Sequence, residues 1–257
     1  MIHKIRHLLG KRTTRPIFVI GTGRSGTHWL AKSLQSHRAI RATIEKKPMF
    51  RWVTQMALDA STEQQLLPKL ISAYRWQMFL STPRLYLDKS HPNIWLAEHL
   101  QAAFPDALFI GIERNPFATV ASMLRHRGVA LWHQRWRDFP VPNRFLGISE
   151  KLAQHYDELP LAVQCAHRWL AHHQRLAQLQ REMPHSVHVI QYETLATDSV
   201  ETMRHLQAFL KLDTPIASPT VATDSLHKWK SYLTSQQIDQ IWQVVGCLET
   251  EQLQRAA

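Results

Sequence analysis

The sequence predicts an α/β fold with a mostly parallel central sheet flanked by helices. Three apolar segments are typical of buried strands, 17–20, 107–112 and 187–190, and longer segments with helical periodicity separate them. Strands that alternate with helices favour parallel pairing, with helices covering both faces of the sheet. A glycine-rich turn, Gly21–Gly26, follows the first strand directly and leads into a helix.

Length, composition and charge limit the class of protein. The 257 residues, 44% of them hydrophobic, suit one α/β domain over 16–257 behind a basic leader, residues 1–15. The sequence has no apolar run of about 18 residues and no secretory signal, so we expect a cytoplasmic protein without a transmembrane segment. Cys165 and Cys247 lack the spacing of a metal or redox site. The net charge of +11 indicates an anionic ligand, but the cations are too scattered to predict a nucleic-acid partner.

The elements after the first strand begin with a helix over 27–36, which starts where the glycine turn ends. Segment 41–48 shows no clear period and is expected to be irregular. Helical patterns follow over 49–59 and 62–79, the second opened by a Ser61–Thr62 cap.

A short strand over 85–87 is expected next, followed by a helix to about Phe104 and the strand 107–112. Pro116 lies in the first turn of the next helix, where its missing N–H costs nothing. Segment 128–148 is rich in tryptophan and proline, and we expect a long loop or lid there.

The last part of the chain is mainly helical. A long helix is expected over 149–183, interrupted near Pro160, before the strand 187–190. Helices over 198–210 and 235–254 follow, the latter opened by the capping box Thr234-x-x-Gln237.

The segment Gly21-Thr-Gly-Arg-Ser-Gly-Thr27-His-Trp29 carries the first chemistry. Its Gly21-x4-Gly26 spacing is that of a Walker-type loop, in which the amides at a helix N-terminus hold a phosphate. The position of the phosphate-binding lysine is occupied by Thr27, and the nearby cation is Arg24. Ordinary ATP or GTP chemistry is therefore disfavoured.

With Arg24-Ser25-Gly26-Thr27 and Trp29, this segment resembles the phosphosulfate loop of sulfotransferases that use 3′-phosphoadenosine 5′-phosphosulfate (PAPS). The resemblance implies a P-loop-like sulfotransferase fold. It also implies that PAPS is bound by the following residues of the loop and helix start, with the tryptophan stacked on the adenine: Gly23, Arg24, Ser25, Gly26, Thr27, His28 and Trp29.

Three later segments extend the resemblance in the same order along the chain. Arg114 at a strand end and Ser122 on the next helix resemble the family's 3′-phosphate site, and an arginine fork suits a phosphate. Tyr192 stands where the family places a tyrosine on the adenine. Ser225–Leu233 resembles the late loop, with Lys228 or Lys230 in place of an Arg-Lys-Gly sequence that this chain lacks.

The resemblance implies an in-line displacement that needs no metal, with Arg24 stabilising the developing charge. A general base is also expected. Lys89-Ser90-His91 resembles the Lys-Thr-His of cytosolic members, in which the histidine is the base. His91-Pro92-Asn93 also resembles the turn of bacterial and Golgi-type members, whose base is a glutamate, and Glu45 stands near that place. We favour His91, because Lys46 and Lys47 are expected to lower the pKa of Glu45.

The sequence therefore predicts a PAPS-dependent sulfotransferase, closer to bacterial and Golgi-type members than to eukaryotic cytosolic ones. It would sulfate a hydroxyl or amine of a small-molecule, glycan or glycolipid acceptor and release 3′-phosphoadenosine 5′-phosphate (PAP). Three alternatives remain open at this point: a P-loop kinase for a nucleotide or small molecule, a non-catalytic PAPS-binding protein and a nucleic-acid-binding protein. The catalytic candidates are His91, Arg24, Lys89 and Glu45.

Overall fold

The computed structural model describes residues 15–218 and 223–246, so residues 1–14 of the expected leader and Cys247 lie outside it. A five-stranded, all-parallel sheet with the order β2-β3-β1-β4-β5 forms the centre. This confirms the predicted fold class. The strands are β1 (Pro16–Gly21), β2 (Ile40–Ile44), β3 (Leu85–Lys89), β4 (Leu108–Glu113) and β5 (Val187–Gln191).

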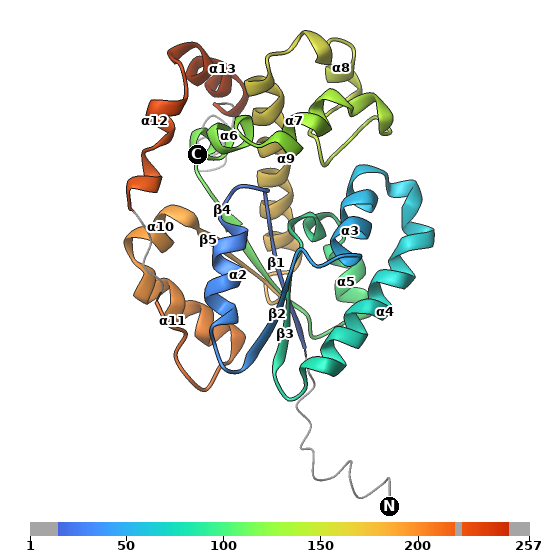
Figure 1. Cartoon of the computed structure of the whole chain (residues 1–257), viewed down its shortest axis with the longest axis vertical. Helices are drawn as coiled ribbons and strands as arrows, with labels where there is room; N and C mark the ends of the chain where they lie inside the picture. Colours follow the sequence, from blue (N-terminus) through green and yellow to red (C-terminus); the bar gives the residue numbers. More distant parts are fainter. Residues whose placement is uncertain (1–14, 219–222, 247–257) are drawn as a thin grey trace, which may run out of the picture.

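Helices cover both faces of the sheet (Figure 1). One face packs against α2 (Thr27–Gln35), α10 (Tyr192–Thr197) and α11 (Ser199–Leu210). The other packs against α3 (Met49–Leu58), α4 (Glu63–Ser81), α5 (Ala97–Ala103) and the C-terminal half of α9 (Leu161–Glu182).

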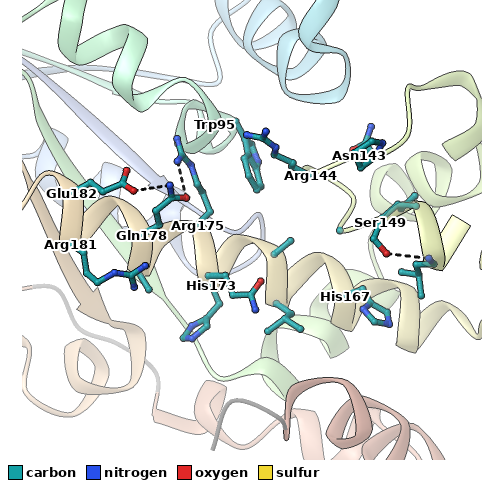
Figure 2. A pocket seen from close by; sticks show the side chains of 18 residues that line it. Trp95, Asn143, Arg144, Ser149, His167, His173, Arg175, Gln178, Arg181 and Glu182 are labelled. Carbon is teal, nitrogen blue, oxygen red and sulfur yellow. Dashed lines mark hydrogen bonds between the residues drawn. The ribbon is translucent and has the colours of Figure 1, made fainter. Parts of the chain in front are cut away.

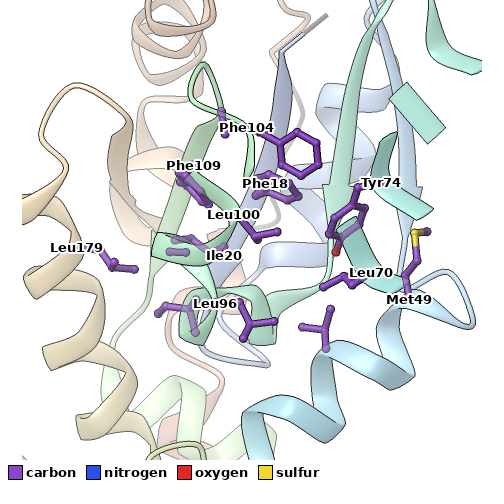
Figure 3. Packing of buried hydrophobic residues seen from close by; sticks show 14 of the residues in the cluster. Phe18, Ile20, Met49, Leu70, Tyr74, Leu96, Leu100, Phe104, Phe109 and Leu179 are labelled. Carbon is purple, nitrogen blue, oxygen red and sulfur yellow. The ribbon is translucent and has the colours of Figure 1, made fainter. Parts of the chain in front are cut away.

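Strand β1 shows why the sheet needs cover on both sides. Ile17 and Val19 point into the cluster under α2 and α11. Phe18 and Ile20 point into the opposite cluster, where Phe18 lies among other aromatic rings (Figure 3). All four side chains are fully buried, which is the physical basis of the continuous apolar run in this strand.

A third layer lies beyond the carboxyl ends of the strands (Figure 1). Its apolar cluster joins the N-terminal half of α9 to several shorter helices. These are α6 (Pro116–Leu124), α7 (Arg127–Gln134), α12 (Trp229–Tyr232) and α13 (Ser235–Val245). The helix predicted over 149–183 is confirmed only from Leu161, where α9 begins directly after Pro160, and the short helix α8 (Glu150–Ala153) is the α-helix before it. The predicted capping box of Thr234 and Gln237 is present. No helix in the described ranges is long and apolar enough to cross a membrane.

The expectation of an irregular segment over 41–48 was wrong for residues 41–44, because β2 forms an edge strand paired with β3, and residues 45–48 are irregular. Polar residues obscure its pattern in the sequence. Thr43 is buried but donates a hydrogen bond to the Asp88 carboxylate (2.9 Å) and lies 2.6 Å from the Tyr86 hydroxyl. Long-range partners thus make a polar residue acceptable in the sheet.

The long loop expected over 128–148 was also partly wrong, because α7 occupies its first half. His126 caps this helix by accepting a hydrogen bond from the Val129 amide at Nδ1 (3.3 Å). Gly128 in the first turn lowers the helical propensity and hides the helix from a sequence analysis. The second half does form a loop, closed by a bridge between Asn143 and Ile148.

Candidate active site

The glycine-rich loop connects β1 to α2 at the centre of the sheet. Gly21 (φ +142°) and Gly26 (φ +98°) have backbone conformations that favour glycine. A Cβ at Gly21 would lie 2.5 Å from the Ile112 carbonyl oxygen, and one at Gly26 would lie 2.6 Å from the Tyr192 ring. The loop is therefore pressed against the ends of β4 and β5.

The start of α2 is open to an anion. Gly26 is the N-cap and supplies no side-chain hydrogen bond to the first amides of the helix. Ser25 is buried and donates to the carbonyl oxygens of Thr22 (2.7 Å) and Ile112 (3.2 Å), which fixes the loop to β4. Thr27 is also buried, Trp29 is half-buried and His28 is exposed. Uncapped amides at a helix N-terminus are donors for a phosphate or sulfate.

Arg24 joins this loop to the second predicted motif. It is exposed, has a left-handed backbone conformation (φ +80°), and donates from Nε to the Ser122 hydroxyl on α6 (3.1 Å). Two residues 98 positions apart in the chain are thus in direct contact.

Arg114, at the end of β4, forms the centre of a second cluster. Its guanidinium lies 4.3 Å from the centroid of the Tyr192 ring and donates from Nη2 to the Ser225 carbonyl oxygen (2.9 Å). The hydroxyls of Tyr192 and Ser225 are 3.0 Å apart. Arg114 Nε is buried without a hydrogen-bond partner. The cluster therefore keeps one cationic donor free for an anion.

Lys228 and Lys230 do not join this cluster in the structure. Both are exposed, and Lys230 lies over the Trp229 ring at 5.8 Å. Within the described ranges, no hydrogen bond or ion pair connects either lysine to Arg114 or Tyr192. From the late segment, it is Ser225 that contacts the other candidates.

Three catalytic candidates meet on the other side of the glycine-rich loop. Lys89 Nζ forms an ion pair with the Glu45 carboxylate, and His91 Nδ1 is 3.7 Å from the same oxygen. A Cβ at Gly23 would lie 3.0 Å from His91 Nε2, so the imidazole faces the loop. Neither ring nitrogen of His91 has a hydrogen-bond partner. The ends of β2 and β3 thus bring Glu45, Lys89 and His91 to the loop.

Burial and charge set the protonation of these groups. Burial lowers the pKa of His91 to about 4, and the positive charges of Lys89 and Arg168 act in the same direction, so the imidazole is neutral at pH 7. The neighbouring His91 and Lys89 hold the pKa of Glu45 at about 2. The sequence analysis attributed this lowering to Lys46 and Lys47, but the charged partner is Lys89, from the neighbouring strand.

A buried carboxylate supports the turn that carries His91. Asp88 is fully buried and accepts hydrogen bonds from Thr43 Oγ1 (2.9 Å), Tyr74 OH (3.1 Å) and Asn93 Nδ2 (3.1 Å). Burial raises its pKa to about 6. These contacts fix the end of β3 to α4 and to the turn after His91. The sequence analysis did not identify this network, because its members are far apart in the chain.

Arg168 on α9 was also missed. Its side chain is fully buried, with the guanidinium 4.4 Å from the Phe145 ring centroid and 4.9 Å from that of Trp132. Arg168 precedes His172 by four residues and Leu176 by eight, and all three are buried on α9. This helical spacing is the sequence signal that could have identified Arg168 as buried.

A separate cavity of about 1080 Å³ runs along the outer face of α9 (Figure 2). Trp95, Arg144, His173 and Arg175 are among its lining residues. None of the predicted site residues lines it, so it is distinct from the cluster at the strand ends.

Comparison with known proteins agrees with the fold described above. The chain matches the family described as "Sulfotransferase family" over residues 16–215. No curated protein sequence matches it significantly.

Three solved structures share the fold. The sulfotransferase domain from the curacin biosynthetic pathway has 17% identity and a TM-score of 0.59, covering 93% of this chain and 99% of that one. The sulfotransferase domain of the Synechococcus PCC 7002 olefin synthase has 14% identity and a TM-score of 0.58, covering 90% and 95%. A mouse sulfotransferase complexed with PAP has 18% identity and a TM-score of 0.51, covering 90% and 83%. Since the family match spans most of the sequence, the chain belongs to the sulfotransferase family of enzymes.

Proposed function

We propose that this sulfotransferase transfers the sulfuryl group of PAPS to a hydroxyl or amine of a small-molecule, glycan or glycolipid acceptor. The observation that carries the proposal is the hydrogen bond between Arg24 and Ser122, which joins the two predicted phosphate-binding motifs. The PAP complex of the mouse sulfotransferase supports the choice of donor.

The residues at the strand ends fit such a donor. Residues 23–28 would hold the 5′-phosphosulfate at the open start of α2, with Arg24 adding a positive charge and Trp29 stacking on the adenine. Arg114 and Ser122 would bind the 3′-phosphate, for which Arg114 Nε has a free N–H. Tyr192, packed against Gly26, would contact the adenine. Lys228 and Lys230 would add only long-range positive charge, because they lie outside direct contact.

When bound, PAPS supplies the sulfuryl group and leaves as PAP. Arg24 and the first amides of α2 would stabilise the negative charge that develops on the leaving phosphate. Lys89 is held by Glu45 beside the same loop and would add a second cation.

His91 is the proposed general base that accepts the proton of the acceptor. It is neutral at pH 7, and its Nε2 faces the loop. Glu45 is the weaker candidate, because its ion pair with Lys89 stabilises the carboxylate and its pKa is about 2. We therefore propose that Glu45 positions Lys89 and His91.

Calorimetric titration with PAP, ATP and AMP in metal-free buffer tests the donor site. Arg114→Ala is expected to weaken PAP binding at least tenfold, since a charge-assisted hydrogen bond contributes about 1.5–3 kcal/mol. Arg125→Ala is the matched control, because Arg125 also lies over a tyrosine, Tyr232, at 4.0 Å, but is exposed at the end of α6. ATP binding equal to that of PAP, or an equal loss in both variants, would contradict the proposal and favour a kinase or a nonspecific anion binder.

A further inference from the structure

We propose that Arg168 binds an anionic group of the acceptor, at a buried position beside His91. The inference rests on the proposed sulfuryl transfer and specifies its acceptor: a molecule that carries a carboxylate or a similar oxyanion in addition to the hydroxyl or amine.

Arg168 is a buried charge without a partner. The side chain is 0% exposed, and none of its nitrogens Nε, Nη1 and Nη2 has a hydrogen-bond partner. No carboxylate in the described part of the chain forms an ion pair with it. A buried charge is strongly unfavourable unless it is paired and hydrogen-bonded. Burial lowers the pKa of Arg168 only to about 10, so the guanidinium stays charged at pH 7.

Two aromatic rings surround the Arg168 guanidinium. The Phe145 and Trp132 rings contact the guanidinium and are themselves arranged edge-to-face at 5.2 Å. Aromatic rings attract the cation but accept no in-plane hydrogen bonds from its N–H groups. A guanidinium held in this way retains the fork of donors that binds an oxyanion through two parallel hydrogen bonds.

Arg168 also lies close to the proposed base, His91. The Phe145 ring contacts both groups, because its centroid is 6.3 Å from that of the His91 ring and 4.4 Å from Arg168 Cζ. His91 and His133 also have buried nitrogens without partners. Buried polar atoms without partners, at Arg168 and His91, thus lie on the same Phe145 ring, whereas an apolar core holds few such atoms.

Two segments of the fold supply the rings around Arg168. Helix α7 carries Trp132 and the 143–148 loop carries Phe145, and both rings contact the guanidinium. Burial lowers the pKa of His126, which caps α7, and the positive charges of Arg24 and Arg168 act in the same direction.

Acetate is the probe for this site, and saturation with PAP blocks the phosphate sites. The thermal unfolding of wild type, Arg168→Met and Arg175→Met is measured with PAP, and again without it, in acetate or chloride at equal ionic strength. Arg175 is the matched control, because it lies two turns along the same helix but is paired with Glu98. Acetate is expected to raise the melting temperature of the wild type and of Arg175→Met. The apparent Kd for acetate in these two proteins should be at least tenfold lower than in Arg168→Met.

The variants also differ in stability without acetate. Arg168→Met removes an unpaired charge and is expected to melt at or above the wild-type temperature, whereas Arg175→Met loses an ion pair and melts below it. The same acetate response in wild type and Arg168→Met, or a loss of stability in Arg168→Met as large as in Arg175→Met, would overturn the inference. If PAP fails to bind while the acetate response still depends on Arg168, the anion site stands and the proposed donor fails.

Discussion

Replacing the buried Asp88 by Asn tests whether the polar network under His91 carries an ionised carboxylate. Asp88 accepts three hydrogen bonds of 2.9–3.1 Å from Thr43, Tyr74 and Asn93. Burial nevertheless dominates and raises its pKa from the ordinary 3.8 to about 6. The folded protein therefore holds this proton more tightly than the unfolded chain does.

The sign of the effect follows from that difference. Ionisation is easier in the unfolded chain, so the contribution of Asp88 to stability is greatest below its unfolded pKa. It falls as the pH rises and is fully lost above the folded pKa of about 6. A shift of about two units corresponds to about 3 kcal/mol in total, of which about 1.4 kcal/mol is lost between pH 5 and pH 7.5.

Urea unfolding of the wild type and of Asp88→Asn over that pH range measures the effect. The asparagine does not titrate, and subtraction of the two curves cancels the other titrating groups. The unfolding free energy of Asp88→Asn minus that of the wild type should increase by about 1.4 kcal/mol as the pH rises from 5 to 7.5. Asp106→Asn, at an exposed position, controls for the lost negative charge. Parallel curves for wild type and Asp88→Asn would show that the hydrogen bonds fully offset the burial and would refute this reasoning.

The remaining predictions concern the loop, the base and a turn. Gly26→Ala should weaken PAP binding at least tenfold by calorimetry. The φ of +98° at this position is unfavourable for alanine, and a Cβ would lie 2.6 Å from the Tyr192 ring. Unchanged affinity would contradict this prediction. His91→Asn should lower the rate of transfer from labelled PAPS by about 10²–10⁴-fold with little change in PAP affinity. In the wild type, kcat/KM should be constant above about pH 5 and fall as the pH drops towards the His91 pKa of about 4; a profile unchanged by the mutation would exclude His91 as the base. Gly147→Ala should lower the unfolding free energy by about 2 kcal/mol or more, since a Cβ would lie 2.3 Å from a backbone carbonyl oxygen of α9. Gly128→Ala should have little effect, because a Cβ there would meet only a side chain.

The strands that the sequence predicts best are those buried on both faces. β1 and β4 show continuous apolar runs, because helices cover both of their sides. β2 lacks such a run, since Thr43 is polar and its hydrogen-bond partner Asp88 is 45 residues away. Only the folded chain reveals that this polar side chain has a partner.

The same distinction applies to the site. The glycine-rich loop, Arg114 and Tyr192 follow directly from motifs placed after strands, because parallel strands end at the same edge of the sheet. The helical spacing of Arg168 with His172 indicates that it is buried, but its contact with Trp132 depends on how α7 packs on α9, which no local pattern encodes. Helix α7 itself was taken for a loop, so the residues it carries were not expected near the base.

The central position of β1 in the sheet has a consequence for how this protein can diverge. On one side of the loop after β1 lie Arg114 and Tyr192, which follow β4 and β5. On the other side lie Glu45, Lys89 and His91, from the ends of β2 and β3. Mutations that remodel one side therefore leave the contacts of the other side in place. On the proposed function, descendants of this chain could exchange one acceptor for another while keeping the same donor.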